Sequence, residues 1–432
     1  MNESLLSYFW KTRCFPQQCL KTTHNEEISI ISPGMPNSNQ GPDFLMAKIR
    51  IGEVLWVGQV EIHVMSSDWL RHGHQSDPNY QNVVLHVVWE DDLPEEKGLP
   101  QAPVLQLKDY ISPNLIDLYQ NLTGAKSQIA CISLLNDVEP IHLSAQIESA
   151  SVERLEEKAE RMATGLRQNG SDWDALFYIE ICRYLNSPVN APAAEELTKR
   201  LSWKLILRTR EDLFRLESLV LGCAGLLTEK AEDLLSEKMS GEAGFLLQKY
   251  GLIPMKGSDW HYLRMRPAHF PDLRLAQLCA FFHSLERPFH SILDCNSLDQ
   301  ARSLFQINPS PYWDFHYRAG GKKHAPKIKR LGSPTIDLLF INVICPMIHL
   351  FGTRQGKPEF GNLALQWLEE IPAENNKWTR IWQQTGFSLE NARQSQGIIR
   401  QFRHYCEPKK CLHCKIGHRI MSRPDRLEPT YP

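Results

Sequence analysis

The sequence lacks most of the short motifs that identify common enzyme classes. It contains no G-x-x-x-x-G-K-[ST], no G-x-S-x-G and no H-E-x-x-H, and no G-x-G-x-x-G follows a predicted strand. Phosphate-loop nucleotide hydrolases, nucleophile-elbow serine hydrolases, zincin proteases and dinucleotide-binding domains therefore lose their usual support. A function has to be sought in less common groupings of residues.

Charge of one sign and long apolar runs are also missing. The 48 Lys and Arg nearly balance the 50 Asp and Glu, so binding to nucleic acid would have to come from local patches. The longest apolar run, 335–352, contains Asp337, Asn342 and Pro346, which suits a core helix better than a membrane span. The first residues show no secretory signal pattern. We expect a cytoplasmic protein without membrane contact.

The 11 cysteines lack the even number and regular spacing of a disulfide framework, which indicates reduced thiols. The exception is HYCEPKKCLHCKIGH, where Cys406, Cys411 and Cys414 form C-x4-C-x2-C. A Cys-x-x-Cys step brings two sulfurs into one coordination sphere, which predicts Zn²⁺ or an iron–sulfur cluster. A redox dithiol and unliganded thiols are the alternatives. A fourth ligand would come from among His413, His418, Cys14, Cys19, Cys131 and Cys345.

Hydrophobic periodicity predicts an α+β protein in three regions. Residues 1–130 mix α and β, whereas 131–256 and 257–432 are mainly helical, the last region ending in the cysteine cluster. Within the first region the order is helix, strand, strand, strand, helix, strand. The strands are predicted at 28–32, 44–51, 54–64 and 82–89, and the second helix lies within 66–77.

Two acidic residues, Asp43 and Glu61, lie in otherwise apolar, strand-like sequence. If Lys48 pairs with Leu55 across the hairpin, Asp43 is carried toward Val60 and Glu61. Carboxylates that converge at strand ends suit a hard divalent cation, so we expect Mg²⁺ or Mn²⁺ there, with water as a nucleophile for phosphodiester hydrolysis. Alternatively, Asp43 belongs to a turn and Glu61 faces solvent.

Histidines gather near this acidic pair. Glu61 and His63 share one face of the predicted strand. His72 and His74 are two residues apart, and they chelate together only if their segment is not a regular helix. One alternative is a second site of the Zn²⁺ type, and the other is that Asp68 caps a helix while the histidines are satisfied locally. The four histidines that fall within 24 residues are His63, His72, His74 and His86.

The predicted element order, with Pro42-Asp43 ahead of Glu61-Ile62-His63, resembles the PD-(D/E)XK nuclease superfamily over about the first 110 residues. In that superfamily the Asp and Glu hold the metal, and a Lys two residues beyond the Glu orients or activates water. The resemblance implies that Asp43 and Glu61 are metal ligands and catalytic residues, with His63 in the position of the Lys. A neutral imidazole acts as a base or a ligand near pH 7, but it is not the permanently charged group of the pattern.

Two further resemblances concern the chain as a whole. Some nucleases of this superfamily close an iron–sulfur cluster with one early and three late cysteines, which implies Cys14 or Cys19 as the fourth ligand here. The GPDF, VEIH, SSDW and CLHCKIG segments are also similar to those of an uncharacterised bacterial family of unknown function. That similarity implies no activity.

The stretch 317–330 is locally basic, with six Lys or Arg and no acid, and 400–426 carries eight Lys or Arg against two acids. Such patches neutralise phosphates, although a solvated surface is the alternative. The cations expected to contact nucleic acid are Lys322, Lys323, Lys327, Lys329 and Arg330.

These observations favour a metal-dependent nuclease or a nuclease-like protein that binds nucleic acid. The competing interpretation is a non-catalytic interaction protein that carries structural metal sites on a degenerate nuclease fold. A hydrolase of small substrates is the third. Convergence of Asp43, Glu61 and His63 distinguishes the first interpretation from the second.

Overall fold

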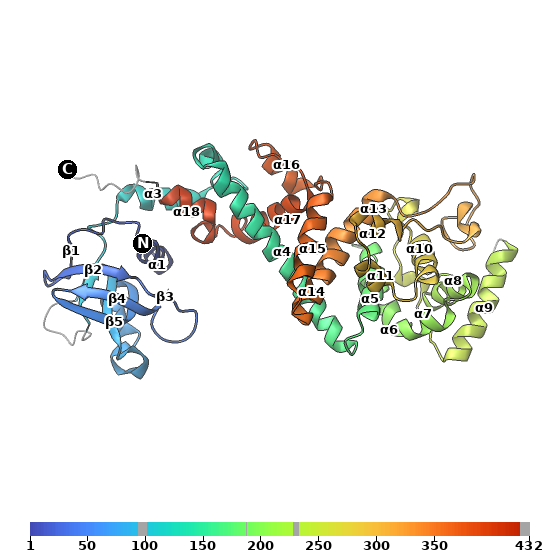
Figure 1. The fold of residues 1–432 in the computed structure, drawn as a ribbon, viewed down its shortest axis with the longest axis horizontal. Helices are drawn as coiled ribbons and strands as arrows, with labels where there is room; N and C mark the ends of the chain where they lie inside the picture. Colours follow the sequence, from blue (N-terminus) through green and yellow to red (C-terminus); the bar gives the residue numbers. More distant parts are fainter. Residues whose placement is uncertain (94–101, 187, 228–232, 424–432) are drawn as a thin grey trace. The chain divides into compact units, whose positions relative to one another are not determined.

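The computed structural model describes residues 1–93, 102–186, 188–227 and 233–423. In this part of the chain an N-terminal sheet is followed by many helices, which confirms the predicted α+β class (Figure 1). The chain divides into two compact units, Met1–Ile147 with Ile399–Pro432, and Glu148–Ile398. The three predicted regions differ from this division, because helical periodicity does not show which helices share a core. The cysteine-containing end belongs to the N-terminal unit.

The first unit is built on a sheet of seven strands in the order β1-β2-β4-β5-β6-β7, with β3 paired to β4. Strands β4 and β5 are antiparallel, whereas β5 and β6 are parallel. The strands are β1 (Leu20–Lys21), β2 (Glu27–Ser32), β3 (Met35–Pro36), β4 (Phe44–Ile51), β5 (Val54–Met65), β6 (Val83–Glu90) and β7 (Val104–Gln106).

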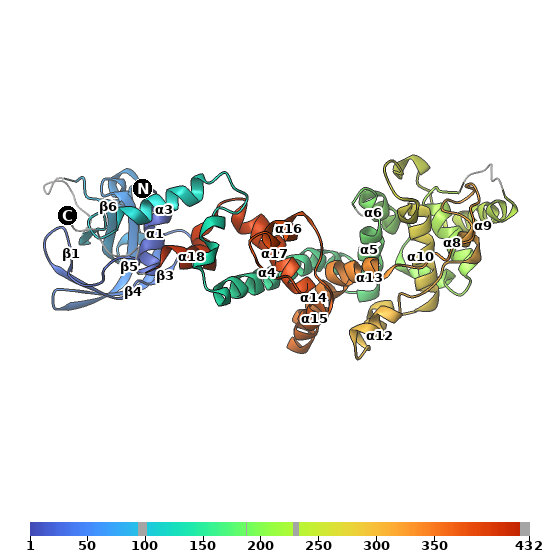
Figure 2. The same ribbon diagram turned by 90° about the horizontal axis from the view of Figure 1, so that it is seen from above.

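Helices of the first unit come from both ends of the chain. They are α1 (Glu3–Thr12), α2 (Asp68–Arg71), α3 (Pro113–Gly124), the start of α4 (Pro140–Gln168) and α18 (Lys415–Met421). The shorter turns are the 3₁₀ segments η1 (His74–Ser76), η2 (Pro78–Tyr80), η3 (Ile132–Asp137) and η9 (Cys411–His413), and the π-helical η8 (Gln401–Cys406). Figure 2 shows α18 beside α1 and α3, and the Tyr8 hydroxyl bonds to His418 Nδ1 at 2.8 Å.

Helix α1 forms as its sequence predicts. The Asn2 side chain accepts a hydrogen bond from the Leu5 amide at 2.9 Å, which satisfies one of the free amides at the helix start. Leu5, Leu6, Phe9 and Trp10 are all buried. This apolar stripe holds α1 against β5.

The β4–β5 hairpin has a different register from the predicted one. Lys48 pairs with Val57, not with Leu55, because the chain turns at Gly52 and Glu53 and pairs Ile51 with Val54. A bulge between Phe44 and Ala47 then shifts the register, so that Phe44 lies opposite Val60. Asp43 still arrives next to Glu61.

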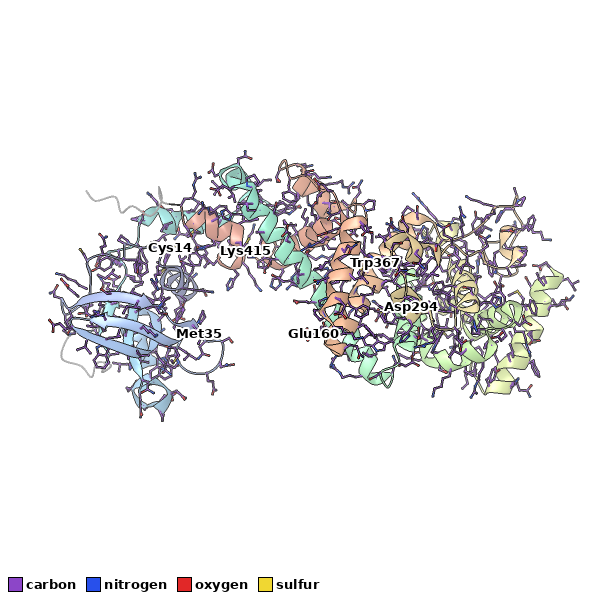
Figure 3. All side chains as sticks on the ribbon, viewed as in Figure 1. Cys14, Met35, Glu160, Asp294, Trp367 and Lys415 are labelled. Carbon is purple, nitrogen blue, oxygen red and sulfur yellow. The ribbon has the colours of Figure 1, made fainter. Side chains whose placement is uncertain are left out.

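The second unit is helical, and its helices share one large apolar core that includes Trp367 (Figure 3). Its α-helices are the rest of α4, then α5 (Trp173–Leu185), α6 (Ala191–Arg200), α7 (Trp203–Thr209), α8 (Leu213–Cys223), α9 (Leu234–Tyr250), α10 (Pro271–Ser284), α11 (Pro288–Leu293), α12 (Leu298–Ser303), α13 (Ser333–Leu339), α14 (Cys345–Gln355), α15 (Pro358–Glu370), α16 (Lys377–Gln383) and most of α17 (Ala392–Arg400). The short turns are η4 (Gly257–Asp259), η5 (Pro267–His269), η6 (Pro311–Asp314) and the π-helical η7 (Phe340–Ile344).

One helical segment, Ser333–Gln355, is long and apolar enough to cross a membrane, and 67% of its most apolar window is buried inside the protein. Leu339, Phe340, Ile344 and Met347 all have less than 1% of their surface exposed. Burial of this kind is what a core helix requires, and it agrees with the sequence prediction for this run.

Candidate metal centre

The two predicted carboxylates lie side by side. The Asp43 amide donates to Glu61 Oε2 at 3.1 Å, and the amide of Ile62 donates to Asp43 Oδ2 at 3.0 Å. Each carboxylate is therefore held by a backbone amide of the strand that carries the other. Burial raises the pKa of Asp43 to about 6. Burial and then the charge of Asp43 raise the pKa of Glu61 to about 8.

The parallel strand β6 adds a histidine to the acidic pair. Register places His86 opposite Glu61, and His63 follows two residues later on the same face of β5. His63 Nδ1 and His86 Nε2 share a hydrogen bond of 2.9 Å. The other ring nitrogen of His63, Nε2, is 3.5 Å from Glu61 Oε1. His63 is thus fixed on one side by His86 and faces the Glu61 carboxylate on the other.

The loop after β5 brings two more imidazoles to the same place. Helix α2 ends at His72, Gly73 has a φ of 75°, and His74 begins a 3₁₀ turn, so the segment is not a regular helix. His72 Nδ1 lies 3.2 Å from His63 Nε2, and His74 Nε2 lies 3.3 Å from Glu61 Oε1. One nitrogen from each of His63, His72 and His74 lies within 4.8 Å of the other two.

Burial keeps the imidazoles of His63, His74 and His86 neutral. Burial, and then the neighbouring rings, lower the pKa of both His63 and His86 to about 3. Burial and then His72 also lower the pKa of His74. Within the part of the chain that the structure describes, the buried atoms His74 Nε2 and His86 Nδ1 have no hydrogen-bond partner. A neutral imidazole nitrogen without a partner is available as a metal ligand.

The donors fit a divalent transition metal. Imidazole nitrogens with a carboxylate are typical ligands of Zn²⁺, Mn²⁺ or Fe²⁺, whereas Mg²⁺ prefers oxygen ligands. His63, His72, His74 and Glu61 would hold such an ion. His86 has a different position, because its Nε2 bonds to His63 rather than pointing to the shared nitrogens, so it orients a ligand.

Aromatic residues that the sequence did not suggest surround the histidines. The Tyr80 ring stacks on His74 with centroids 3.8 Å apart, and Trp69 packs against both His74 and His86. A cleft of about 620 Å³ begins at His74 and is bordered by Trp69, Asp77 and Tyr80. Burial of Trp69 agrees with the alternative that this segment is a short helix packed on the core. Nothing in the sequence indicated Tyr80, because stacking across a loop has no periodic signature.

The family described as a protein of unknown function (DUF2851) matches residues 3–377. The chain belongs to this family. No curated protein and no solved structure matches the chain. The matched range includes every acid and histidine of the candidate metal centre and ends before Cys406. Since the family description names no activity, the functional argument rests on the geometry of these residues.

In this family member the three late cysteines lie together, but not with the early cysteines that the nuclease resemblance implies. Cys406, Cys411 and Cys414 border a small cavity together with Cys131. Cys14 contacts Thr12 and Ser422 instead. Cys19 is exposed and Cys345 belongs to the second unit. Spacing along the chain does not distinguish these candidates, because only the fold brings Cys131 near the end of the chain.

One predicted nucleic-acid contact is wrong. Lys329 is 5% exposed, and its ammonium group donates to the carbonyls of Trp313 and His316, each at 2.5 Å. Burial lowers its pKa to about 8. The basic residues next to Lys329 in the sequence suggested an exposed charged surface. Its side chain is instead buried and stabilises the loop through these hydrogen bonds. The other four predicted cations, Lys322, Lys323, Lys327 and Arg330, are exposed.

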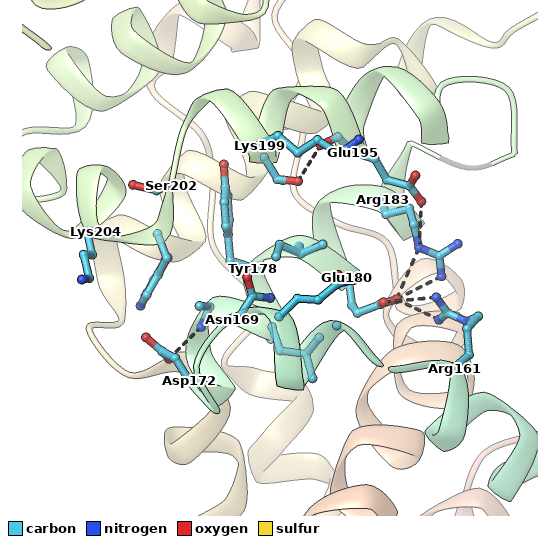
Figure 4. A pocket seen from close by; sticks show the side chains of 17 residues that line it. Arg161, Asn169, Asp172, Tyr178, Glu180, Arg183, Glu195, Lys199, Ser202 and Lys204 are labelled. Carbon is cyan, nitrogen blue, oxygen red and sulfur yellow. Dashed lines mark hydrogen bonds and ion pairs between the residues drawn. The ribbon is translucent and has the colours of Figure 1, made fainter. Parts of the chain in front are cut away.

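The second unit contains a separate cavity of about 580 Å³ between α4, α5 and α6 (Figure 4). Its most prominent charged group is Glu180, which lies between Arg161 and Arg183 at 2.8 and 3.0 Å. Arg183 also lies 3.7 Å from Glu195, so two acids balance the two arginines, and none of the predicted site residues borders the cavity. We assign no function to it.

Proposed function

We propose that this protein is a metal-dependent phosphodiesterase that acts on nucleic acid, with its metal centre in the first unit. The observation that carries the proposal is the approach of Glu61 Oε1 to the ring nitrogens of His63 and His74, at 3.5 and 3.3 Å, inside a group of three imidazoles. Buried polar atoms are normally paired, so a carboxylate that faces His74 Nε2, which is unpaired among the described residues, favours a cation bound between them.

The residues would have distinct roles. Glu61, His63, His72 and His74 would bind the ion, which acts as a Lewis acid on a phosphoryl oxygen when bound. Asp43 holds the Ile62 amide and so fixes β5 next to the ligands. With a pKa of about 6, Asp43 is mostly ionised at neutral pH and can accept a proton. His86 positions the His63 ring.

Nucleic acid as the substrate rests on two observations. The elements α1, β2, β4, β5, α2 and β6 follow the order that the nuclease resemblance implies, and they carry Asp43 and Glu61 to adjacent positions. The half-buried Tyr80 ring also borders the cleft beside His74, and aromatic faces of this kind stack on bases.

Metal binding and cleavage should be measured on the same preparations. Chelator-treated protein is titrated with Mn²⁺, Zn²⁺ or Mg²⁺, then incubated with labelled single- and double-stranded DNA and RNA. We expect Mn²⁺ or Zn²⁺ to support cleavage better than Mg²⁺, and both Glu61→Gln and His74→Ala to lose at least 100-fold in rate. Glu27→Gln and His24→Ala, which change exposed residues of the same unit, are the matched controls. Equal cleavage by all five proteins would refute the assigned centre.

A structural metal site is the second candidate, and burial favours it. Glu61 and His63 are only 5% and 2% exposed, so substrate would reach the ion past His72, which is exposed, and His74, which is half-buried. In that case metal would bind and raise the unfolding free energy, while no nucleic acid is cleaved with any ion. The two candidates share the ligands and differ in turnover.

A further inference from the structure

Four cysteine thiols surround one small cavity in the first unit. Cys131 precedes η3, Cys406 ends η8, Cys411 begins η9 and Cys414 precedes α18. Together they border a cavity of about 20 Å³. Cys406, Cys411 and Cys414 are buried, with 8% exposure or less.

The backbone around these thiols is specialised. The chain changes from α-helix to π-helix over Gln401–Cys406, a rare geometry that is frequent at functional sites. Gly417 lets α18 approach the Cys411 loop closely, because a Cβ at this position would lie 2.1 Å from the Cys411 carbonyl oxygen. Lys415, the first residue of α18, is labelled in Figure 3.

Hydrogen bonds to sulfur come from one buried amide. Gln401 Nε2 donates to Cys406 Sγ at 3.5 Å and to Cys414 Sγ at 3.3 Å. Gln146 Nε2 donates to Gln401 Oε1 at 2.7 Å, and the Lys415 amide donates to Gln146 Oε1 at 2.9 Å. A chain of oriented donors that ends on two sulfurs is the outer support expected for thiolates that bind metal.

We propose that Cys131, Cys406, Cys411 and Cys414 are the four thiolate ligands of an iron–sulfur cluster. Four thiolates are the complete ligand set of such a cluster, and the donors from Gln401 would stabilise their charge. The spacing favours a cluster over a single Zn²⁺. Tetrahedral zinc has Zn–S bonds of about 2.3 Å, which holds its sulfurs less than about 4 Å apart. Among the described residues only the histidine group has its ligand atoms all within 4.8 Å, so no three of these sulfurs are that close.

The cluster would also link distant parts of the sequence. Cys131 precedes the whole second unit, Glu148–Ile398, and the other three ligands follow it. An inorganic group bound by ligands from both chain segments would link the two parts of the first unit, which the second unit separates in the sequence. Metal binding then contributes directly to folding of this unit.

The test begins with wild-type protein expressed with iron and purified without oxygen. We expect about four iron and four acid-labile sulfides per chain, with visible absorption that is bleached by reduction. Cys131→Ser should lose the sulfide and at least half of the iron, whereas Cys14→Ser, the early cysteine of the same unit, should keep both. Circular dichroism of each variant shows whether the fold is retained.

A milder variant keeps the test decisive if Cys131→Ser does not fold. Gln401→Leu should retain the iron and sulfide but shift the reduction potential, because it removes both N–H···S hydrogen bonds. One zinc per chain without sulfide would overturn the cluster. Iron and sulfide that are lost from Cys14→Ser but not from Cys131→Ser would overturn the ligand assignment. Neither result depends on cleavage or on the histidine centre, since Glu61→Gln should leave the sulfide content unchanged.

Discussion

Glu61→Gln should stabilise the metal-free protein at alkaline pH, although it removes a proposed metal ligand. Burial and the charge of Asp43 raise the pKa of Glu61 from 4.5 to about 8. The folded state therefore binds this proton more tightly than the unfolded chain. Stability is lost as the pH rises from 4.5, and the loss is complete above 8. Glutamine has nearly the same shape and stays neutral, so the variant avoids the loss.

The window from pH 6.5 to 8 isolates this group. The pKa of Asp43 is raised to about 6, so most of the stability that is lost when this carboxyl group ionises is already lost below the window. His63 and His86 have pKa values lowered to about 3, so they are neutral in the folded state throughout the window. Their remaining titration in the unfolded chain is the same in both proteins and cancels from the comparison. One pH unit at a full difference in proton binding is 1.36 kcal/mol, so wild type should lose about 2 kcal/mol relative to the variant across the window.

Hydrogen exchange of peptides from β5 and β6, measured with chelator present, gives the opening free energy of this region. Wild type and variant are compared at the same pH, which cancels the intrinsic exchange rate. Glu27→Gln on the exposed face of β2 is the control. Adding Mn²⁺ should reverse the order, so that wild type becomes the better protected protein. Parallel pH curves for wild type and Glu61→Gln would refute the assignment of a raised pKa to this carboxyl group.

Three further outcomes are expected. Zn²⁺ binding should release about one proton per ion at pH 7 and almost none at pH 9.5, because Glu61 must ionise to bind the ion. Calorimetric titration in buffers of different ionisation enthalpy measures this release. Proton release that does not change with pH would contradict the prediction. Gly58→Ala should destabilise the first unit by about 1 to 3 kcal/mol in chemical unfolding, since its Cβ would lie 2.4 Å from Val84 Cγ1 and 2.6 Å from the Asn82 carbonyl, whereas Gly124→Ala, with open space around it, should cost less. Burial lowers the pKa of Lys158 to about 7, so between pH 7.5 and 9 wild type should gain about 2 kcal/mol more stability than Lys158→Met. The gain from Lys329, whose pKa is lowered to about 8, is common to both proteins, and an equal gain in both would assign the whole effect to other groups.

The local elements of the first unit were predictable because each leaves a local signature. Asn2 caps α1, an apolar segment marks β5, and Gly52-Glu53 marks the hairpin turn. The predicted register was wrong by two residues at Lys48, because the pairing of Ile51 with Val54 at the turn sets it. The adjacency of Asp43 and Glu61 followed from the hairpin in spite of this error.

The sequence by itself determined the residue types of both candidate centres. Within each centre, pairs such as Glu61 and His63 or Cys411 and Cys414 are two or three positions apart, and side chains so near in sequence remain close in space. Only the tertiary structure decided which donors meet. Parallel pairing of β6 with β5 put His86 behind His63, and Gly73 turned His72 and His74 toward Glu61. Return of the chain end to the first unit brought Cys406, Cys411 and Cys414 beside Cys131, whereas Cys14 contacts Thr12 and Ser422. The physical reason is that burial and long-range pairing, which set these contacts and their pKa values, depend on the whole fold rather than on any window of sequence.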